Sequence, residues 1–240
     1  MSPTTTRRPS IYVEIEIACP IDRVWELTQD TDAHPRWDLR FSRITSVEQL
    51  DGGGYRFRYE RSLLVHTLRG TGVSIGETRR PDGSRTSALR FDTTDPLSPM
   101  GDGRGYWRYL PTERGMTFIT GYDYEPGFGR SGALLDRLVT RRVIGWMTAL
   151  SFDRLRIWAE TGEAPQKWSM LSTFLWWRPD RPRASRCARH PQDRAASVMA
   201  QAPTTLAELA DPLWWTCTWA GCVTFWCRMS APTGPSRWRT

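Results

Sequence analysis

The chain has almost no lysine and no asparagine. Among its 240 residues Lys167 is the one lysine, although basic residues number 33. Codons for lysine and asparagine are rich in adenine, so a GC-rich coding sequence accounts for most of the arginine excess. Arginine stays protonated and forms no Schiff base, so the composition nearly excludes catalysis by a side-chain amine.

Long apolar runs and paired cysteines are also missing. The longest uncharged run, 212–227, has 16 residues, fewer than the roughly 20 that cross a bilayer as a helix. The first apolar segment is interrupted by Glu14 and Glu16, unlike the core of a secretory signal. Five cysteines, four of them after residue 186, form no disulfide framework. We therefore expect no transmembrane segment and a cytoplasmic location.

The remaining composition is that of a globular protein. Hydrophobic residues make up 39% and charged residues 25%, enough for one domain with an appendage. Residues 1–160 hold 23 basic and 21 acidic side chains, whereas the rest holds 10 and 5, so the formal charge of +7 lies mostly in the tail. This charge distribution does not predict a basic face interleaved with aromatic residues, which nucleic-acid-binding proteins normally carry. We therefore expect no nucleic-acid partner.

The first 125 residues predict a strand, short helices and a series of hairpins. Residues Ile11 to Ile17 alternate apolar and polar side chains, which is typical of a half-buried strand. Pro20 opens a short helical segment, and Pro35 limits a second one. Six further strands, separated by glycine- and proline-containing turns, are expected to pair in antiparallel order: 41–50, 55–61, 63–75, 86–91, 105–110 and 116–124.

The spacing of apolar residues changes to a helical period after residue 130. One stripe runs from Leu135 to Trp158, with Ser131 as the expected N-cap and Gly162 as the expected stop. A helix of about 30 residues is roughly 45 Å long at 1.5 Å per residue. It must lie across a sheet to bury that stripe.

This order of elements predicts an α+β fold in which a curved antiparallel sheet wraps a long C-terminal helix. The segment C-P-I-D-R-V-W-E-L-T at 19–28, followed by H-P-R-W-D at 34–38, resembles the opening of the START-like, or SRPBCC, superfamily of polyketide cyclase/dehydrase and lipid-transport proteins. The resemblance implies the helix-grip fold and a cavity for a hydrophobic small molecule between sheet and helix. It covers residues 11–162, about two thirds of the chain.

Aromatic side chains on the predicted strands are candidates to line such a cavity, together with apolar residues of the long helix. Ligand pockets are mostly apolar, although the same rings could simply fill a core. The candidate ligand-binding residues are Tyr55, Phe57, Tyr59, Trp107, Tyr109, Phe118, Tyr122, Leu135, Val139, Val143, Trp146 and Leu150.

Candidates for catalysis are few. His66, Tyr59 and Tyr122 have the chemistry for proton transfer. The histidines lack the spacing of a helical metal site, and Gly101 to Gly105 matches neither nucleotide-binding pattern, so we expect no metal and no cofactor and read 101–105 as a flexible connection. Three functions stay open: binding or carriage of a hydrophobic small molecule, a polyketide cyclase or dehydratase using the same cavity, and a non-catalytic interaction module with a filled core.

The two ends of the chain are expected to differ from the domain. Residues 1–10 are predicted to be disordered. Residues 163–240 hold eight of the 13 tryptophans and four of the five cysteines, a composition unlike ordinary disorder. This tail could dock on the domain, contact a membrane surface or a protein, or be an aberrant C-terminus. The sequence leaves its folding and the oligomeric state open.

Overall fold

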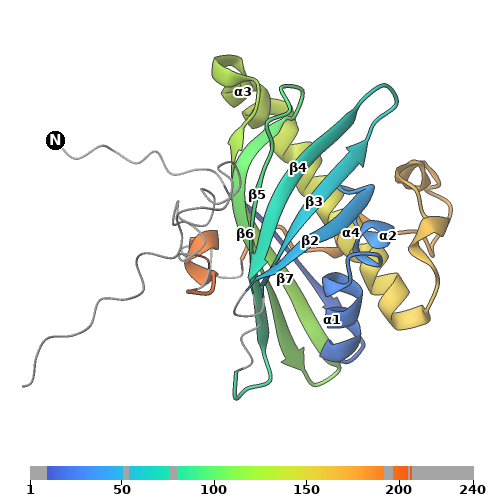
Figure 1. Cartoon of the computed structure of the whole chain (residues 1–240). Coiled ribbons are helices and arrows are strands. Elements are labelled where there is room, and N and C mark those ends of the chain that lie inside the picture. The colour runs from blue at the N-terminus through green and yellow to red at the C-terminus, as the bar shows by residue number, and fades with distance from the viewer. Residues whose placement is uncertain (1–9, 51–53, 76–79, 192–196, 205, 207–240) are drawn as a thin grey trace, which may run out of the picture. The chain divides into compact units, whose positions relative to one another are not determined.

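The computed structural model describes residues 10–50, 54–75, 80–191, 197–204 and 206. Apart from Ser10, the N-terminal segment predicted to be disordered lies outside these residues, as does the tail beyond Leu206 with three of its cysteines. The helix-grip fold is confirmed: an open, curved antiparallel sheet lies against one long helix (Figure 1).

The sheet has seven strands in the order β1-β7-β6-β5-β4-β3-β2, all pairs antiparallel. The predicted first strand, and the number and antiparallel pairing of the six strands after it, are thus correct. β1 spans Ser10–Ile17, and the remaining bounds are β2 Arg43–Leu50, β3 Gly54–Ser62, β4 Thr67–Ile75, β5 Arg85–Asp92, β6 Met100–Thr112 and β7 Gly115–Pro126.

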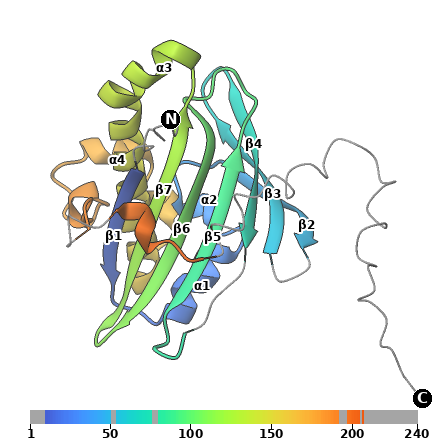
Figure 2. The same cartoon turned by 90° about the vertical axis from the view of Figure 1, so that its left-hand side faces the viewer.

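Both faces of the sheet are covered, by different parts of the chain. The inner face carries the main core, in which Val13, Phe118 and Tyr109 pack with helical residues such as Phe152. The outer face carries a smaller cluster around Tyr106, over which η5 (Val198–Gln201) and Leu206 lie (Figure 2). Period-two alternation along the strands sends neighbouring residues to these two faces.

Two short helices connect β1 to β2 and close one side of the inner face. α1 spans Ile21–Gln29 and α2 spans His34–Trp37. Pro35 stands in the first turn of α2, where a proline is tolerated because that N–H has no helical partner. The Trp37 indole N–H donates to the carbonyl of Leu27 at 2.9 Å and locks the two helices together.

The long helix differs from the predicted one in its first half. It begins at Gly129, not at an N-cap Ser131, and consists of α3 (Gly129–Leu135), a π-helical turn (Asp136–Thr140) and α4 (Arg141–Thr161). The wider turn changes which face points to the sheet. Leu135, Val139 and Val143 are consequently exposed, so the predicted burial of their part of the stripe is wrong. From Ile144 onward the stripe faces the core, with Leu150, Leu155 and Trp158 buried and Trp146 and Met147 half-buried, and Gly162 ends the helix at φ 75° as predicted.

Two further expectations need correction. The predicted strand 63–75 begins at Thr67, so His66 lies in the β3–β4 turn. Residues 101–105 are not a flexible connection but part of β6. The glycines there serve the sheet, because a Cβ on Gly103 would meet the Phe91 ring at 2.3 Å and the Asp123 carbonyl oxygen at 2.8 Å.

The described chain beyond α4 packs against the domain. Trp168 is 2% exposed. Glu14 and Ala188 exchange two backbone hydrogen bonds of 2.9 Å. The Arg183 backbone N–H and the Arg186 guanidinium both donate to the buried Asp153 carboxylate. Residues of the tail up to Ala188 therefore continue the fold past the domain boundary predicted after residue 162.

Candidate functional site

The aromatic residues predicted to line a cavity share the inner face of the sheet. One row across five strands, read from β3 to β7, consists of Phe57, Gly72, Phe91, Gly103 and Tyr124. Since side chains alternate between faces, Tyr55 and Tyr59 on β3 belong to the same face, as do Trp107, Tyr109, Phe118 and Tyr122 on β6 and β7.

Rings and glycines alternate along this row for a steric reason. A Cβ on Gly72 would approach the Phe57 ring to 2.3 Å, and one on Gly70 would approach the Tyr59 ring to 2.2 Å. The aromatic rings therefore lie over the neighbouring glycines, close to the sheet. A side chain at either glycine would lift the ring toward α4. The glycines therefore keep the aromatic rings of the inner face close to the sheet and away from α4.

The inner face is packed unevenly. On the β6–β7 side the rings are buried against α4, and Phe118 stacks on Phe152 with centroids 4.5 Å apart. On the β3–β5 side Phe57 and Ser87 are buried, but several other inner residues are half-buried: Tyr55, Tyr59, Leu89, Phe91 and, from β6 and α4, Met100 and Met147. Solvent therefore reaches part of each of these side chains.

A polar cluster lies between α2 and the sheet. Asp38, fully buried, accepts hydrogen bonds from Arg40 at 2.6 and 2.9 Å and lies 3.2 Å from His34 Nε2. Although burial opposes it, the positive charge of Arg40 holds the pKa of Asp38 well below its usual range. Burial lowers the pKa of His34, against the influence of Asp38, so its imidazole is neutral near pH 7. His34 is stacked on Trp37.

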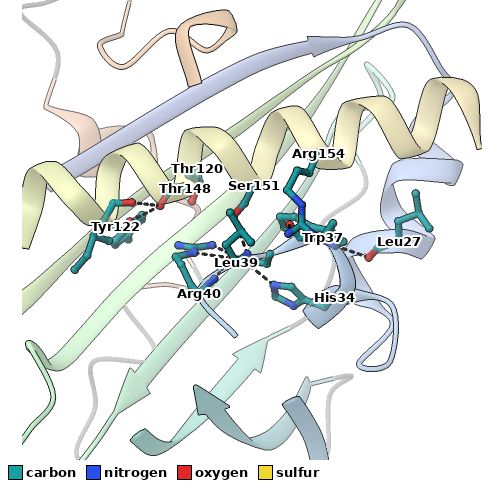
Figure 3. A network of polar contacts seen from close by, with 12 residues as sticks. Leu27, His34, Trp37, Leu39, Arg40, Thr120, Tyr122, Thr148, Ser151 and Arg154 are labelled. Carbon is teal, nitrogen blue, oxygen red and sulfur yellow. Dashed lines mark hydrogen bonds and ion pairs between the residues drawn. The ribbon is translucent and has the colours of Figure 1, made fainter. Parts of the chain in front are cut away.

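Polar groups of α4 complete this cluster (Figure 3). The Ser151 hydroxyl accepts the Leu39 backbone N–H at 2.9 Å. The Tyr122 hydroxyl is 2.8 Å from the Thr148 hydroxyl, and the Arg40 guanidinium lies over the Tyr122 ring at 5.5 Å. Burial raises the pKa of Tyr122, so it remains a protonated phenol. The cluster contains donors and acceptors that could orient a ligand.

An open pocket of about 470 Å³ adjoins the cluster, between α2, the start of β2, the end of β3 and the C-terminal half of α4. Its wall combines apolar side chains with arginines. The lining residues include Leu39, Phe41, Ile44, Arg61 and Arg154. None of the twelve predicted ligand-binding residues lines this pocket.

The three predicted catalytic candidates have separate partners. His66 Nε2 lies 2.8 Å from Asp95 at the end of the sheet. The Tyr59 hydroxyl donates to the Asp92 carbonyl at 3.3 Å, whereas Tyr122 contacts Thr148. Of the remaining candidates on the helix, Trp146 is half-buried and Leu150 is buried, and Leu135, Val139 and Val143 are exposed.

Sequence reasoning missed Asp38, Arg40 and Arg154. Asp38 is the last residue of the H-P-R-W-D segment at 34–38, and Arg40 follows two residues later, but nothing local shows that α2 turns these side chains inward. Arg154 sits on the predicted apolar stripe face, where an arginine is unusual. It donates to the carbonyls of Trp37 at 2.7 Å, Arg36 at 2.9 Å and Pro165 at 2.8 Å.

Fold and inner face together define a START-like protein. Residues 8–157 match the family model described as polyketide cyclase / dehydrase and lipid transport. The chain belongs to this family.

Individual relatives give less detail. The chain is 40% identical over 163 residues to a Bacillus subtilis protein named uncharacterized membrane protein YndG, covering 67% of this chain and 61% of the relative. The chain thus spans about three fifths of that relative's length. Similar solved structures include TTHA0849 from Thermus thermophilus (18% identity, 63% of this chain and 97% of the other, TM-score 0.49) and the Zhui aromatase/cyclase from a Streptomyces species (14%, 66% and 99%, TM-score 0.47).

Within the described residues no helix is both long and apolar enough to cross a bilayer. No group of three histidine, cysteine, aspartate or glutamate side chains gathers there as metal ligands either. The cytoplasmic location stays a prediction, since the Bacillus relative is named a membrane protein.

Proposed function

We propose that the protein binds and carries a hydrophobic small molecule, lipid-like or polyketide-like, between the inner face of the sheet and α4. The observation that supports this most directly is the half-buried state of inner apolar side chains such as Leu89, Phe91 and Met147. In a filled core they would be close-packed and buried. Membership of a family described by cyclase and lipid-transport functions agrees with it.

A group of exposed apolar side chains, which we call the apolar rim, supports carriage in particular. The apolar rim comprises Leu64, Val65, Leu97 and Phe128, with exposures of 106, 98, 58 and 41%. They belong to the β3–β4 turn, the β5–β6 connection and the start of α3, which lie at one end of the sheet (Figure 1). The His66–Asp95 contact and a 3.0 Å bond from the Gly127 N–H to the Pro99 carbonyl join these segments.

Exposed apolar side chains with positively charged residues nearby are typical of a surface that binds an anionic bilayer. Arg137 and Arg142, both exposed, follow the rim along the helix. We propose that the rim touches a membrane while cargo is exchanged, and the name of the Bacillus relative agrees with a membrane location. This contact differs from the tail contact that the sequence suggested.

The membrane contact is tested by sedimentation with vesicles of phosphatidylglycerol and phosphatidylcholine. Leu64→Ser should lower the bound fraction several-fold. Val47→Ser, which changes an exposed valine on β2, should leave it unchanged. Equal binding by the two variants would contradict a role for the rim.

Catalysis is not part of this proposal. A cyclase would use proton-transfer groups that converge on one ligand, whereas His66, Tyr59 and Tyr122 each have a different neighbour. A polyketide cyclase or dehydratase therefore stays the second candidate, favoured by the family description alone.

The binding function is tested with the uncharged fluorescent probe N-phenyl-1-naphthylamine. We expect saturable binding to the full chain, and Leu89→Trp should abolish it by filling the inner face. Thr71→Trp places the same ring at an exposed position of β4 and should have no effect. Probe binding that is unchanged by Leu89→Trp would show that the inner face is not the site.

A further inference from the structure

Positive charge is in excess at the pocket beside the polar cluster. Arg40, Arg61 and Arg154 surround one buried carboxylate, that of Asp38. Arg40 pairs with it directly at 2.6 Å. Among the described residues, no carboxylate lies within ion-pair distance of Arg61 or Arg154. The pocket wall itself holds four arginines (Arg36, Arg43, Arg61 and Arg154) and two aspartates (Asp32 and Asp38), so positive charge is in excess there.

Arg61 has few protein partners for its guanidinium. Its Nε is buried without a hydrogen-bond partner, and its one described side-chain hydrogen bond runs from Nη2 to the Met170 sulfur at 3.6 Å. A thioether is a weak acceptor. The side chain lines the open pocket, so a ligand atom can reach its donors.

Arg154 is 5% exposed, and its Nε also lacks a partner. Its terminal nitrogens donate to carbonyl oxygens, which carry no net charge. Burial lowers its pKa to about 10, with Arg61 adding to the effect and Asp38 opposing it. Arg154 therefore stays charged at neutral pH. A desolvated cation without a counter-charge is costly, and an anion in the pocket would offset that cost.

Besides the charged residues, the wall of the pocket has polar side chains (Thr31, Ser42, Gln166 and Ser169) and one apolar part. Leu39 and Ile44 are buried and contribute with Phe41 to the same pocket. Carboxylate and phosphate groups match the planar donors of arginine.

We propose that this pocket binds the anionic group, a carboxylate or phosphate, of an amphipathic ligand, with Arg61 as the principal contact and Arg154 supplying additional positive charge. The apolar part of the wall, with Leu39, Phe41 and Ile44, receives the adjoining part of the ligand. This inference rests on the proposed function and narrows its cargo to anionic amphiphiles.

The test compares dodecanoate with dodecan-1-ol, which has the same chain without the charge, by calorimetric titration of the full-length protein. Wild type should bind dodecanoate at least tenfold more tightly. Arg61→Gln should remove that preference, a loss equivalent to about 1.4 kcal/mol. Arg61→Lys should keep most of it, because the charge is retained.

Arg58→Gln is the matched control, since Arg58 is exposed on the same strand with the opposite orientation and should bind as wild type. Equal binding of acid and alcohol by wild type, or equal losses in Arg61→Gln and Arg58→Gln, would overturn the inference alone. Failure of both probes to bind would overturn the proposed function as well.

Inorganic phosphate distinguishes the source of the anion. Phosphate that competes with dodecanoate, and loses this effect in Arg61→Gln, supports a shared anionic site. Phosphate that binds through Arg61 while dodecanoate does not bind would assign the pocket to free anions and contradict an amphipathic ligand.

Discussion

Buried charge in this protein concentrates on a few residues next to α2. Asp38 is fully buried and accepts a hydrogen bond from the Arg40 guanidinium, with which it forms an ion pair. His34 lies between Asp38 and the rings of Trp37 and Trp107. Each of these buried charges depends on its partner, because removing one partner leaves the other charge buried and unpaired.

Asp38→Asn should destabilise the fold by about 3–5 kcal/mol, because Arg40 then lacks its counter-charge in a buried site. Urea unfolding monitored by circular dichroism measures this loss. Asp180→Asn removes a carboxylate from an exposed pair with Arg178 and should leave the midpoint unchanged. Similar midpoints for the two variants would contradict the role given to Asp38.

Stability should fall as the pH drops from about 8 to 5. The pKa of His34 is lowered in the fold, whereas an unfolded histidine titrates near 6.5, so the unfolded chain takes up a proton that buried His34 does not. His34→Gln should flatten this slope. His190→Gln, at an exposed histidine, should retain it. Parallel pH profiles for the wild type and His34→Gln would contradict a neutral buried imidazole.

At the level of elements, the sequence predicted strands and turns well but helix faces and burial less well. Alternation placed β1 correctly because one face is buried along its whole length. The π turn at Asp136–Thr140 has no local sequence pattern, so the exposure of Leu135 was not predictable from a regular period. The aromatic candidates on the strands all lie on the inner face of the sheet, a point that the sequence left open, and the Asp38 cluster depends on how α2 docks, which is a tertiary property.

The glycines of the inner face give an element-level prediction. Gly103→Ala should cost about 1–3 kcal/mol, because its Cβ would overlap both the Phe91 ring and a backbone carbonyl of β7. Gly101→Ala on the same strand has its nearest neighbour at 3.5 Å and should be nearly neutral. Equal unfolding midpoints in urea would contradict the account of ring and glycine packing.

For the whole molecule, the chain beyond α4 matters to stability. Trp168 is buried, Arg154 reaches the Pro165 carbonyl, and the Cys187 thiol lies 3.2 Å from the Ala149 carbonyl oxygen. Composition showed that this segment differs from ordinary disorder but could not choose among the explanations for it, because its contacts are made with residues far away in the sequence.

Truncation after Gly162 should therefore lower the thermal midpoint strongly compared with that of the full chain. Thermal unfolding followed by circular dichroism compares the two. In the full chain, Trp168→Ala should cost about 3–5 kcal/mol, which tests the same contacts if the shorter chain does not fold. Unchanged midpoints in both the Gly162 truncation and Trp168→Ala would show that the segment adds nothing to the domain.

The proposed function requires space for an apolar small molecule between the inner face of the sheet and α4. Native mass spectrometry of the freshly purified full-length protein tests it most directly. The account predicts a population heavier than the 240-residue chain by the mass of one small molecule, which organic extraction removes and Leu89→Trp prevents. A single species at the mass of the chain, which also fails to take up added dodecanoate or N-phenyl-1-naphthylamine, would contradict it.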